Sequence, residues 1–224
     1  MGNIGFRIYT TINRPPKELI ERFAGIPAAN LADNMNRTAC VGAAIKPFND
    51  VPLLGPAFTV KAPQGDNLMF HKAIDMALPG DIIVVDGEGD ESHSLCGEIM
   101  FTYAKKRGLA GFVIDGAIRD SYSLKDMDFP VYARAVQPNG PYKNGPGEIG
   151  VPVSIGGRVI FPGDILVGDA DGIVVIRPED AEEMLEKGRR HNNMEKESFR
   201  QIAAGTYDRS WIDKALADKG CEII

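Results

Sequence analysis

The sequence predicts an α/β protein, because segments with helical apolar spacing alternate with short apolar runs that end at glycine or proline turns. The chain of 224 residues carries 25 Gly and 15 Pro, and these are spread along its length, which is typical of many tight turns. Residues 150–176 are dense in β-branched residues and glycine, so we expect a cluster of strands there.

Helices are predicted where proline or aspartate begins a segment and glycine ends it. Pro15 and Pro16 precede the first, Asp66 can cap the third, and Gly108 and Gly205 follow the fourth and fifth. The expected helices are Lys17–Phe23, Ala28–Met35, Asn67–Met76, Gly97–Arg107, Pro178–Ala204 and Asp208–Lys219.

Strands are predicted at Pro56–Ala62 and Gly111–Asp115. Residues 79–87 and 162–170 resemble each other, since each is a Pro-Gly-Asp turn that leads into an apolar strand with an aspartate near its end. We expect these turns, together with Gly65, Gly97 and Gly116, to bring backbone amides and strand-end acids to one cleft. Residues 1–177 are predicted to form an α/β domain, and residues 178–224 a helical arm that packs on a neighbouring subunit.

Composition excludes several classes of protein. The 25 Lys and Arg against 31 Asp and Glu give a net charge of −6, without long basic runs, which argues against nucleic-acid binding. No apolar run approaches the roughly 20 residues of a membrane span, and the first residues do not resemble a signal peptide. Cys40, Cys96 and Cys221 are far apart, which favours a reduced, cytoplasmic protein.

Arg119 and Asp120 lie just past a predicted strand, where ligands of α/β proteins collect. The planar guanidinium of arginine can hold a carboxylate through two parallel hydrogen bonds. Aspartate is a hard oxygen ligand for a divalent cation such as Mg²⁺. The alternative is an ordinary Arg-Asp pair on a surface turn.

A second candidate feature is the helix entry at Gly97. The backbone amides of Glu98, Ile99 and Met100 are expected to be free donors there, at the positive end of the helix dipole, where an anionic oxygen could bind. The alternative is that Glu98 in the first turn serves only to balance the dipole.

Asn67 and His71 are four residues apart on one predicted helix face, so both could contact the same ligand. The alternative for His71 is an ordinary hydrogen-bonded histidine. The acidic run at residues 86–91 is expected to be a solvated loop near the mouth of a cleft, because it lacks the ligand spacing of an EF-hand. His-Glu-x-x-His, Walker and Gly-x-Ser-x-Gly motifs are absent from the sequence.

Taken in order, the motifs resemble one known family. They are Gly65-Asp66-Asn67, Pro79-Gly80-Asp81, the helix from Gly97, the run Val113–Asp120, Phe129-Pro130-Val131 and residues 162–174. This family unites the 4-hydroxy-4-methyl-2-oxoglutarate / 4-carboxy-4-hydroxy-2-oxoadipate aldolases with the proteins called regulator of ribonuclease activity A. The resemblance implies a swivelling β/β/α-type mixed sheet with flanking helices and a C-terminal helical extension.

The resemblance also implies a homotrimer or a dimer of trimers, with an active site between subunits that uses Mg²⁺ or Mn²⁺. It assigns the pyruvate carboxylate to Arg119 and the metal to Asp120. It places pyruvate against Gly97, Ile99 and Met100.

The resemblance assigns further acids to the implied site. Glu98 would act on the metal through a water, Asp33 would come from a neighbouring subunit, and the C-terminal acid would be Glu195 or Glu197, again through a water. The chain also departs from the family: Ser123 stands where an acid is usual, and Asp33 and Glu98 each differ from the aldolase residue by one methylene.

The function implied is a metal-dependent aldolase, a carbon–carbon lyase. It would cleave a 4-hydroxy-2-oxo acid to pyruvate and a second oxo acid, as in the degradation of aromatic compounds, and would also decarboxylate oxaloacetate. No lysine is singled out for a Schiff base. One alternative is a non-catalytic regulator that binds a ribonuclease through the same trimeric scaffold, and another is a lyase acting on a sugar acid. The helical sequence that continues to residue 224 favours the aldolase group.

Overall fold

The computed structural model describes residues 3–222 and 224, and it confirms the predicted mixed α/β architecture. Its centre is a large sheet with four parallel strands in the middle and short strands at both edges. In spatial order the strands are β1 (Phe6–Ile8), β7 (Gly147–Ile149), β3 (Leu53–Lys61), β4 (Ile82–Cys96), β5 (Gly111–Ile118), β6 (Val131–Val136) and β2 (Lys46–Pro47). None of the helices in the described residues has the length and apolar character that a membrane span requires.

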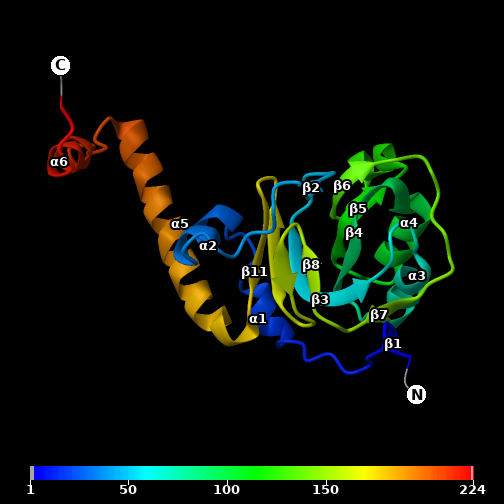
Figure 1. Cartoon of the computed structure of the whole chain (residues 1–224). Helices are drawn as coiled ribbons and strands as arrows, with labels where there is room; N and C mark the ends of the chain where they lie inside the picture. Colours follow the sequence, from blue (N-terminus) through cyan, green and yellow to red (C-terminus); the bar gives the residue numbers. More distant parts are fainter. Residues whose placement is uncertain (1–2, 223) are drawn as a thin grey trace.

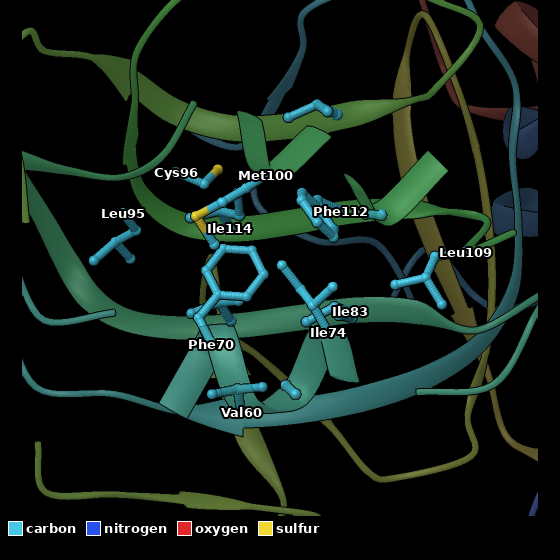
Figure 2. Packing of buried hydrophobic residues seen from close by; sticks show 14 of the residues in the cluster. Val60, Phe70, Ile74, Ile83, Leu95, Cys96, Met100, Leu109, Phe112 and Ile114 are labelled. Carbon is cyan, nitrogen blue, oxygen red and sulfur yellow. The ribbon is translucent and has the colours of Figure 1, made fainter. Parts of the chain in front are cut away.

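One face of this sheet is covered by α3 (Leu68–Met76) and α4 (Glu98–Lys106), as Figure 1 shows. The core beneath them is built around Phe112 of β5, whose ring lies 4.9 Å from that of Phe70 and 5.0 Å from that of Phe129 in edge-to-face contacts. Figure 2 shows Phe70 and Ile74 of α3 and Met100 of α4 packed over the strands. This packing fixes where both helices begin, and both begin at the same edge of the sheet.

A second β-layer covers the other face, in the segment where strands were expected. It consists of the hairpin β8 (Val153–Ile155) and β9 (Arg158–Ile160) and the hairpin β10 (Ile165–Asp169) and β11 (Gly172–Ile176). Strand β10 also pairs antiparallel with the first half of β3, so the two layers are continuous. Apolar side chains from both layers form a shared core.

Outside this layer lie α1 (Lys17–Glu21), α2 (Ala28–Asn34) and α5 (Ala181–Ala204), which pack on β10 and β11. Helix α5 follows the short 3₁₀ turn η2 (Pro178–Asp180) and ends at Gly205, whose φ of 69° suits glycine. The second half of α5 and α6 (Trp211–Asp218) extend away from the body (Figure 1). They expose Phe199 and Trp211. Packing of this arm on a neighbouring subunit stays a prediction.

The prediction for the acidic run was wrong, because residues 86–91 lie within the long strand β4. The strand continues through them by register shifts against β5, and Asp90 pairs with Gly116 after one such shift. Bulges of this kind let polar, glycine-rich sequence remain in a ladder that the neighbouring strand defines. Strand β5 likewise runs three residues beyond Asp115, to Ile118.

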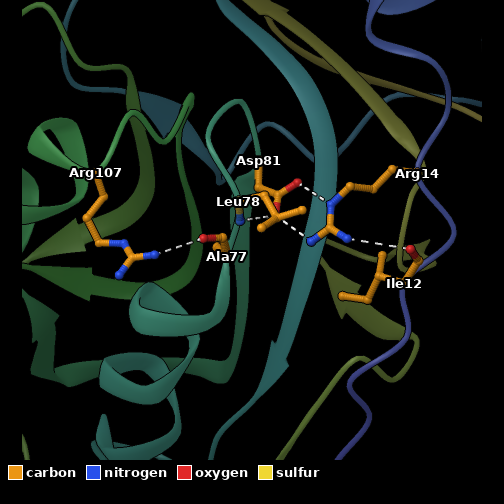
Figure 3. Close-up of polar contacts among 6 residues, drawn as sticks. All are labelled: Ile12, Arg14, Ala77, Leu78, Asp81 and Arg107. Atoms are coloured by element: carbon orange, nitrogen blue, oxygen red, sulfur yellow. Dashed lines mark hydrogen bonds and ion pairs between the residues drawn. The ribbon is translucent and has the colours of Figure 1, made fainter.

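The prediction that the Pro-Gly-Asp turns bring backbone amides and strand-end acids to one cleft was also wrong, because neither the turns nor Asp86 and Asp169 line the cavity beside Arg119. Asp81 directly precedes β4, which places it at the opposite edge from Arg119. Asp164 lies at the same edge, because its carbonyl accepts the N–H of Ala57, the residue paired with Ile82 at the start of β4. Each carboxylate accepts the backbone N–H three residues earlier and binds an arginine. Figure 3 shows Arg14 donating to both oxygens of Asp81, at 2.7 and 2.6 Å. These acids hold the fold together.

Replacing Asp81 by alanine should lower the free energy of unfolding by about 3 kcal/mol, because it leaves the guanidinium of Arg14 and the N–H of Leu78 without their hydrogen-bond acceptor. Asp81→Asn should cost less, since its amide oxygen can still accept one of these hydrogen bonds. Urea denaturation measures both. The control is Glu21→Ala, which removes an exposed ion pair with Lys17 and should change stability by well under 1 kcal/mol. Equal losses for all three variants would contradict the structural role of Asp81.

Candidate active site

The candidate site lies where β4 and β5 end side by side. Cys96 and Ile118, the last residues of these strands, are paired in the ladder, and the N–H of Arg119 donates to the carbonyl of Cys96 at 2.9 Å. The two residues that follow the strands, Gly97 and Arg119, are therefore neighbours although 22 positions apart. This confirms the expected placement of the Arg-Asp pair just past a strand end.

Asp120 is held against the start of α4. Its backbone is left-handed (φ 56°, ψ 30°), and its Oδ2 accepts the N–H of Glu98 at 3.2 Å. A Cβ on Gly97 would overlap Oδ2 of Asp120 and crowd Cγ of Arg119. The glycine is thus required by close approach. A non-glycine residue in the left-handed region costs energy, and such positions gather at functional sites.

Ser123, the departure from the family pattern, supports this turn. Its side-chain hydroxyl and its backbone N–H both donate to the carbonyl of Asp120, at 2.9 and 3.0 Å. An ionised acid at this position could not donate the first of these bonds. Ser123 therefore stabilises the left-handed conformation that aims the Asp120 carboxylate.

Next to these residues is a cavity of about 210 Å³. Arg119 and Asp120 both line this cavity, and Nε of Arg119 lies 3.7 Å from Oδ2 of Asp120. The complete lining is Asn67, His71, Cys96, Gly97, Ile99, Met100, Arg119, Asp120, Pro141 and Lys143. This volume suits a small ligand, since pockets for drug-sized molecules begin at about 300 Å³.

Asn67 is a buried residue of this lining, and only the nitrogen of its side-chain amide is hydrogen-bonded. Its Nδ2 donates to the carbonyl of Leu95 at 2.8 Å, which fixes the orientation of the amide. Its Oδ1 has no hydrogen-bond partner within the part of the chain that the structure describes. A buried acceptor without a donor costs about 1–3 kcal/mol, so this oxygen is an open position for a ligand.

The amides at the start of α4 are less free than the sequence suggested. The N–H of Glu98 is taken by Asp120, and that of Met100 donates to the carbonyl of Gly97 at 2.9 Å because the first turn is tight. Of the three expected donors, Ile99 alone has an N–H without a partner among residues 3–222. The prediction of three free amides was therefore wrong, and one remains for an anion.

The surroundings of the cavity shift the pKa values of two residues that line it. Burial raises the pKa of the Cys96 thiol well above its ordinary value, so the cysteine lines the cavity as a neutral group. Burial and then the charge of Lys143 hold the pKa of His71 below its ordinary value, while Asp75 acts in the opposite direction. His71 is accordingly neutral at pH 7.

Removing the charge of Lys143 should raise the pKa of His71 toward its ordinary value, because a nearby cation disfavours the imidazolium form. The measurement is an NMR titration of Lys143→Met. The chain has only three histidines, so His71→Gln suffices to assign the signal. An unchanged His71 pKa would contradict the proximity of the two side chains.

The remaining predicted site residues lie elsewhere in the chain. The side chain of Glu98 is exposed beside the cavity rather than in its lining. Asp33 is on α2, where it pairs with Arg37 at 3.3 Å, and Glu195 and Glu197 are on α5. Both of these helices are on the far side of the sheets from α3 and α4 (Figure 1). Within one chain these three acids do not join the cavity.

The two C-terminal acids differ in their surroundings. Glu195 accepts a hydrogen bond from Nδ2 of the buried Asn30 at 2.8 Å, whereas Glu197 pairs with the exposed Arg200 on the same helix. Glu195 therefore has a defined orientation toward α2. A role for either acid in a neighbouring subunit's site stays a prediction.

Sequence reasoning missed Lys143 and Pro141. Both residues lie in a loop with Asn-Gly-Pro turns at residues 139–141 and 144–146. These turns indicate that the chain folds back, but they do not indicate which part of the protein the loop packs against. Hydrogen bonds from Tyr142 to Gly65 and from Asn67 to Tyr142 bring this loop to the start of α3. Local sequence carries no signal for such a pairing.

Fold and site together define a layered α/β protein with a small cleft that combines the cationic side chains of Arg119 and Lys143, one carboxylate and a backbone amide of Ile99 without a partner among the described residues. A family model described as Aldolase/RraA, RraA-like, matches residues 28–175. The chain belongs to this RraA-like family.

Some relatives carry the name of an aldolase, and others are described as RraA inhibitors of RNA processing. A protein of Halalkalibacterium halodurans with the name "Putative 4-hydroxy-4-methyl-2-oxoglutarate aldolase" is 37% identical over 201 residues, which are 89% of this chain and 96% of the relative. Among solved structures, Streptomyces coelicolor RraAS2, described as an unusual member of the RNase ES inhibitor RraA family, has a TM-score of 0.74 at 26% identity and covers 84% of this chain and 100% of its own. The RNA-processing inhibitor RraA of a Thermus species has a TM-score of 0.62 at 28% identity, covering 66% and 91%.

Proposed function

We propose that this protein is a divalent-metal-dependent aldolase that cleaves a 4-hydroxy-2-oxo acid to pyruvate and a second oxo acid, and that it also decarboxylates oxaloacetate. The observation that carries the proposal is the convergence on one small cavity of Arg119, Asp120 and Ile99, whose N–H has no partner among the described residues. The aldolase name of the Halalkalibacterium relative, at 37% identity over most of both chains, supports a lyase.

The donor set is compatible with Mg²⁺ or Mn²⁺. Mg²⁺ commonly takes only one or two protein carboxylates and keeps several waters, and the described residues do not gather three metal-ligating side chains in one place. The carboxylate of Asp120 is 40% exposed and held in the space that a Cβ on Gly97 would fill. Asp120 would bind the cation directly, and Glu98 would contact it through a water. The cation would supply stabilisation of the negative charge on the 2-oxo oxygen.

The residues of the chain would then act as follows. The guanidinium of Arg119 binds the carboxylate of the 2-oxo acid and fixes its orientation, and the N–H of Ile99 donates to an oxygen of the same half of the substrate. A water beside Glu98 accepts the proton of the 4-hydroxyl group. The C3–C4 bond breaks, its electron pair gives the pyruvate enolate, and C4 becomes the carbonyl of the second product. Protonation of C3 releases pyruvate.

Assembly is part of the proposal. Asp33 and either Glu195 or Glu197 would reach the cavity from a neighbouring copy in a trimer or a dimer of trimers. The apolar side chains exposed on α5 and α6 favour such packing.

The test is to mix the purified protein with 4-hydroxy-4-methyl-2-oxoglutarate or oxaloacetate and Mg²⁺, with and without a chelator, and to measure pyruvate. We expect pyruvate from both substrates, and chelator should abolish it. Absence of metal-dependent pyruvate from both would exclude the aldolase proposal.

The second candidate is a regulator that binds a ribonuclease, and the solved RraA structures favour it. Stoichiometric capture of an endoribonuclease by a protein without lyase activity would support this function. Asp120→Asn then separates the two, because it should abolish pyruvate release and leave a protein–protein interaction intact.

A further inference from the structure

The loop between β6 and β7 contains the same tripeptide twice. Asn139-Gly140-Pro141 and Asn144-Gly145-Pro146 hold the two Asn-Gly pairs of the sequence. An Asn-Gly pair is chemically reactive, because glycine has no side chain to keep its backbone nitrogen away from the asparagine amide. Once this nitrogen has lost its proton, it can attack Cγ of the asparagine, which leads to deamidation. Both asparagines are exposed, so accessibility does not distinguish them.

The nitrogen of Gly145 is held by a carboxylate. Its N–H donates to Oδ2 of Asp66 at 3.0 Å, and the N–H of Asn144 donates to the same oxygen. Asp66 is buried, and its other oxygen accepts the N–H of Leu68 at 2.9 Å. The negative charge of Asp66 disfavours removal of the proton from Gly145, and the hydrogen bond fixes the orientation of the peptide group. Asn144 is therefore protected from attack.

The nitrogen of Gly140 has the opposite surroundings. Its N–H has no hydrogen-bond partner within residues 3–222. A Cβ at Gly140 would lie 3.3 Å from Nη1 of Arg119, so a guanidinium lies beside this peptide group. A nearby positive charge favours the deprotonated amide, which is the form that attacks. Gly140 is also exposed, so hydroxide can reach its N–H.

The other groups of Asn139 attach the loop to β4. Its carbonyl accepts the N–H of Ser94 at 2.9 Å and the hydroxyl of the same residue at 2.7 Å. Its Nδ2 donates to the carbonyl of Ser92 at 3.1 Å, which is the one side-chain hydrogen bond of Asn139 among the described residues. This bond is exposed to solvent, and exposed hydrogen bonds open readily. The side chain of Asn139 can therefore turn toward Gly140.

We propose that Asn139 is a site of spontaneous deamidation and that Asn144, in the same tripeptide, is not. The nitrogen of Gly140 loses its proton to hydroxide and attacks Cγ of Asn139. Nδ2 takes up a proton from water and leaves as ammonia, which closes a succinimide ring. Water then adds to one of the two ring carbonyls and opens the ring to an aspartyl or an isoaspartyl residue. Overall, one water is consumed and one ammonia is released.

The modification would change the wall of the cavity. The new carboxylate cannot donate to the carbonyl of Ser92, as Nδ2 does. It adds a negative charge to a loop that passes Arg119 at Gly140. The isoaspartyl form also lengthens the backbone before Pro141, which lines the cavity. Deamidation should therefore weaken the binding of an anion by Arg119.

The experiment follows both asparagines of the unaltered protein during incubation at mildly alkaline pH. Trypsin cleaves after Arg134, Lys143 and Arg158, so Asn139 and Asn144 fall in separate peptides. Mass spectrometry detects deamidation as an increase of about 1 Da. We expect Asn139 to react at least about tenfold faster than Asn144, which corresponds to a difference of about 1.4 kcal/mol between the two barriers. Equal rates in the folded protein, or a faster reaction at Asn144, would overturn the inference.

Two controls separate the effect of structure from that of sequence. In concentrated urea the contacts of Gly145 with Asp66 and of Gly140 with Arg119 are lost, so both peptides should react at similar rates. Gly140→Ala should suppress the reaction at position 139 and leave Asn144 unchanged, because the added methyl group hinders ring closure. A preference for Asn139 that persists in urea would show that the flanking sequence causes it, and the inference would then be wrong.

A last measurement connects the modification with the proposed aldolase function, on which only this step rests. Anion exchange separates the deamidated protein through its additional negative charge. We expect this fraction to release pyruvate more slowly than fresh protein, whereas incubated Gly140→Ala should keep its initial activity. Equal activity of the two fractions would contradict the effect on the cavity. If fresh protein releases no pyruvate, the aldolase proposal fails, and the two peptide masses still test the deamidation site.

Discussion

Arg119→Ala should lower kcat/KM for metal-dependent pyruvate release by about 300- to 1,000-fold. The change removes a charge-assisted contact to the substrate carboxylate worth a few kcal/mol, and each 1.36 kcal/mol is a factor of ten in rate. Stability should hardly change, because the side chain of Arg119 is 44% exposed and, among the described residues, forms an ion pair only with the adjacent Asp120. Steady-state kinetics with oxaloacetate and a urea unfolding curve measure the two quantities.

Arg119→Lys tests the shape of the contact rather than its charge. Lysine cannot form two parallel hydrogen bonds, so we expect an intermediate loss in kcat/KM. Arg7→Ala, in the exposed edge strand β1, is the matched control and should be silent. If Arg119→Ala retained normal turnover, Arg119 would have to be removed from the proposed site.

Gly97→Ala should reduce kcat/KM by at least about 100-fold and weaken Mg²⁺ binding without unfolding the protein. The added methyl group would occupy the position of Oδ2 of Asp120 and press on Cγ of Arg119, so both groups must move. The backbone at Gly97 is extended, with φ −156° and ψ −166°, and alanine adopts this conformation freely. The effect is therefore local to the site.

Gly140→Ala is the comparison for Gly97→Ala. A Cβ at Gly140 would lie 3.3 Å from the flexible Nη1 of Arg119 and from no other atom within 4 Å. We expect less than a tenfold loss in kcat/KM. Titration of Mg²⁺ by calorimetry completes the test, and normal Mg²⁺ affinity in Gly97→Ala would show that Asp120 is not displaced.

Much of the fold was predictable because its boundaries have local chemical causes. Gly205 ends α5 in a left-handed conformation, and the apolar spacing of residues 68–76 places α3 on its sheet. The placement of Arg119 and Asp120 past a strand was predictable for the same reason. The family resemblance, which the family model confirms, rests on such ordered turns.

The parts that sequence reasoning missed depend on partners distant in the chain. The acidic residues of β4 look like a loop, and only pairing with β5 makes them a strand. The Pro-Gly-Asp turns look like parts of a cleft, and only the ion pairs with Arg14 and Arg177 show that Asp81 and Asp164 are structural. Lys143 reaches the site through hydrogen bonds to residues 65–67.

Asp164 also contributes to the orientation of the long helix α5. It binds Arg177, the last residue before η2 and α5, and a helix of 24 residues that starts there is about 36 Å long. A tilt of only about 5° at the start of this helix would move its far end by about 3 Å, which is the length of a hydrogen bond. The ion pair between Asp164 and Arg177, together with the packing of α5 on β10 and β11, therefore helps to set where Glu195 and the exposed Phe199 lie.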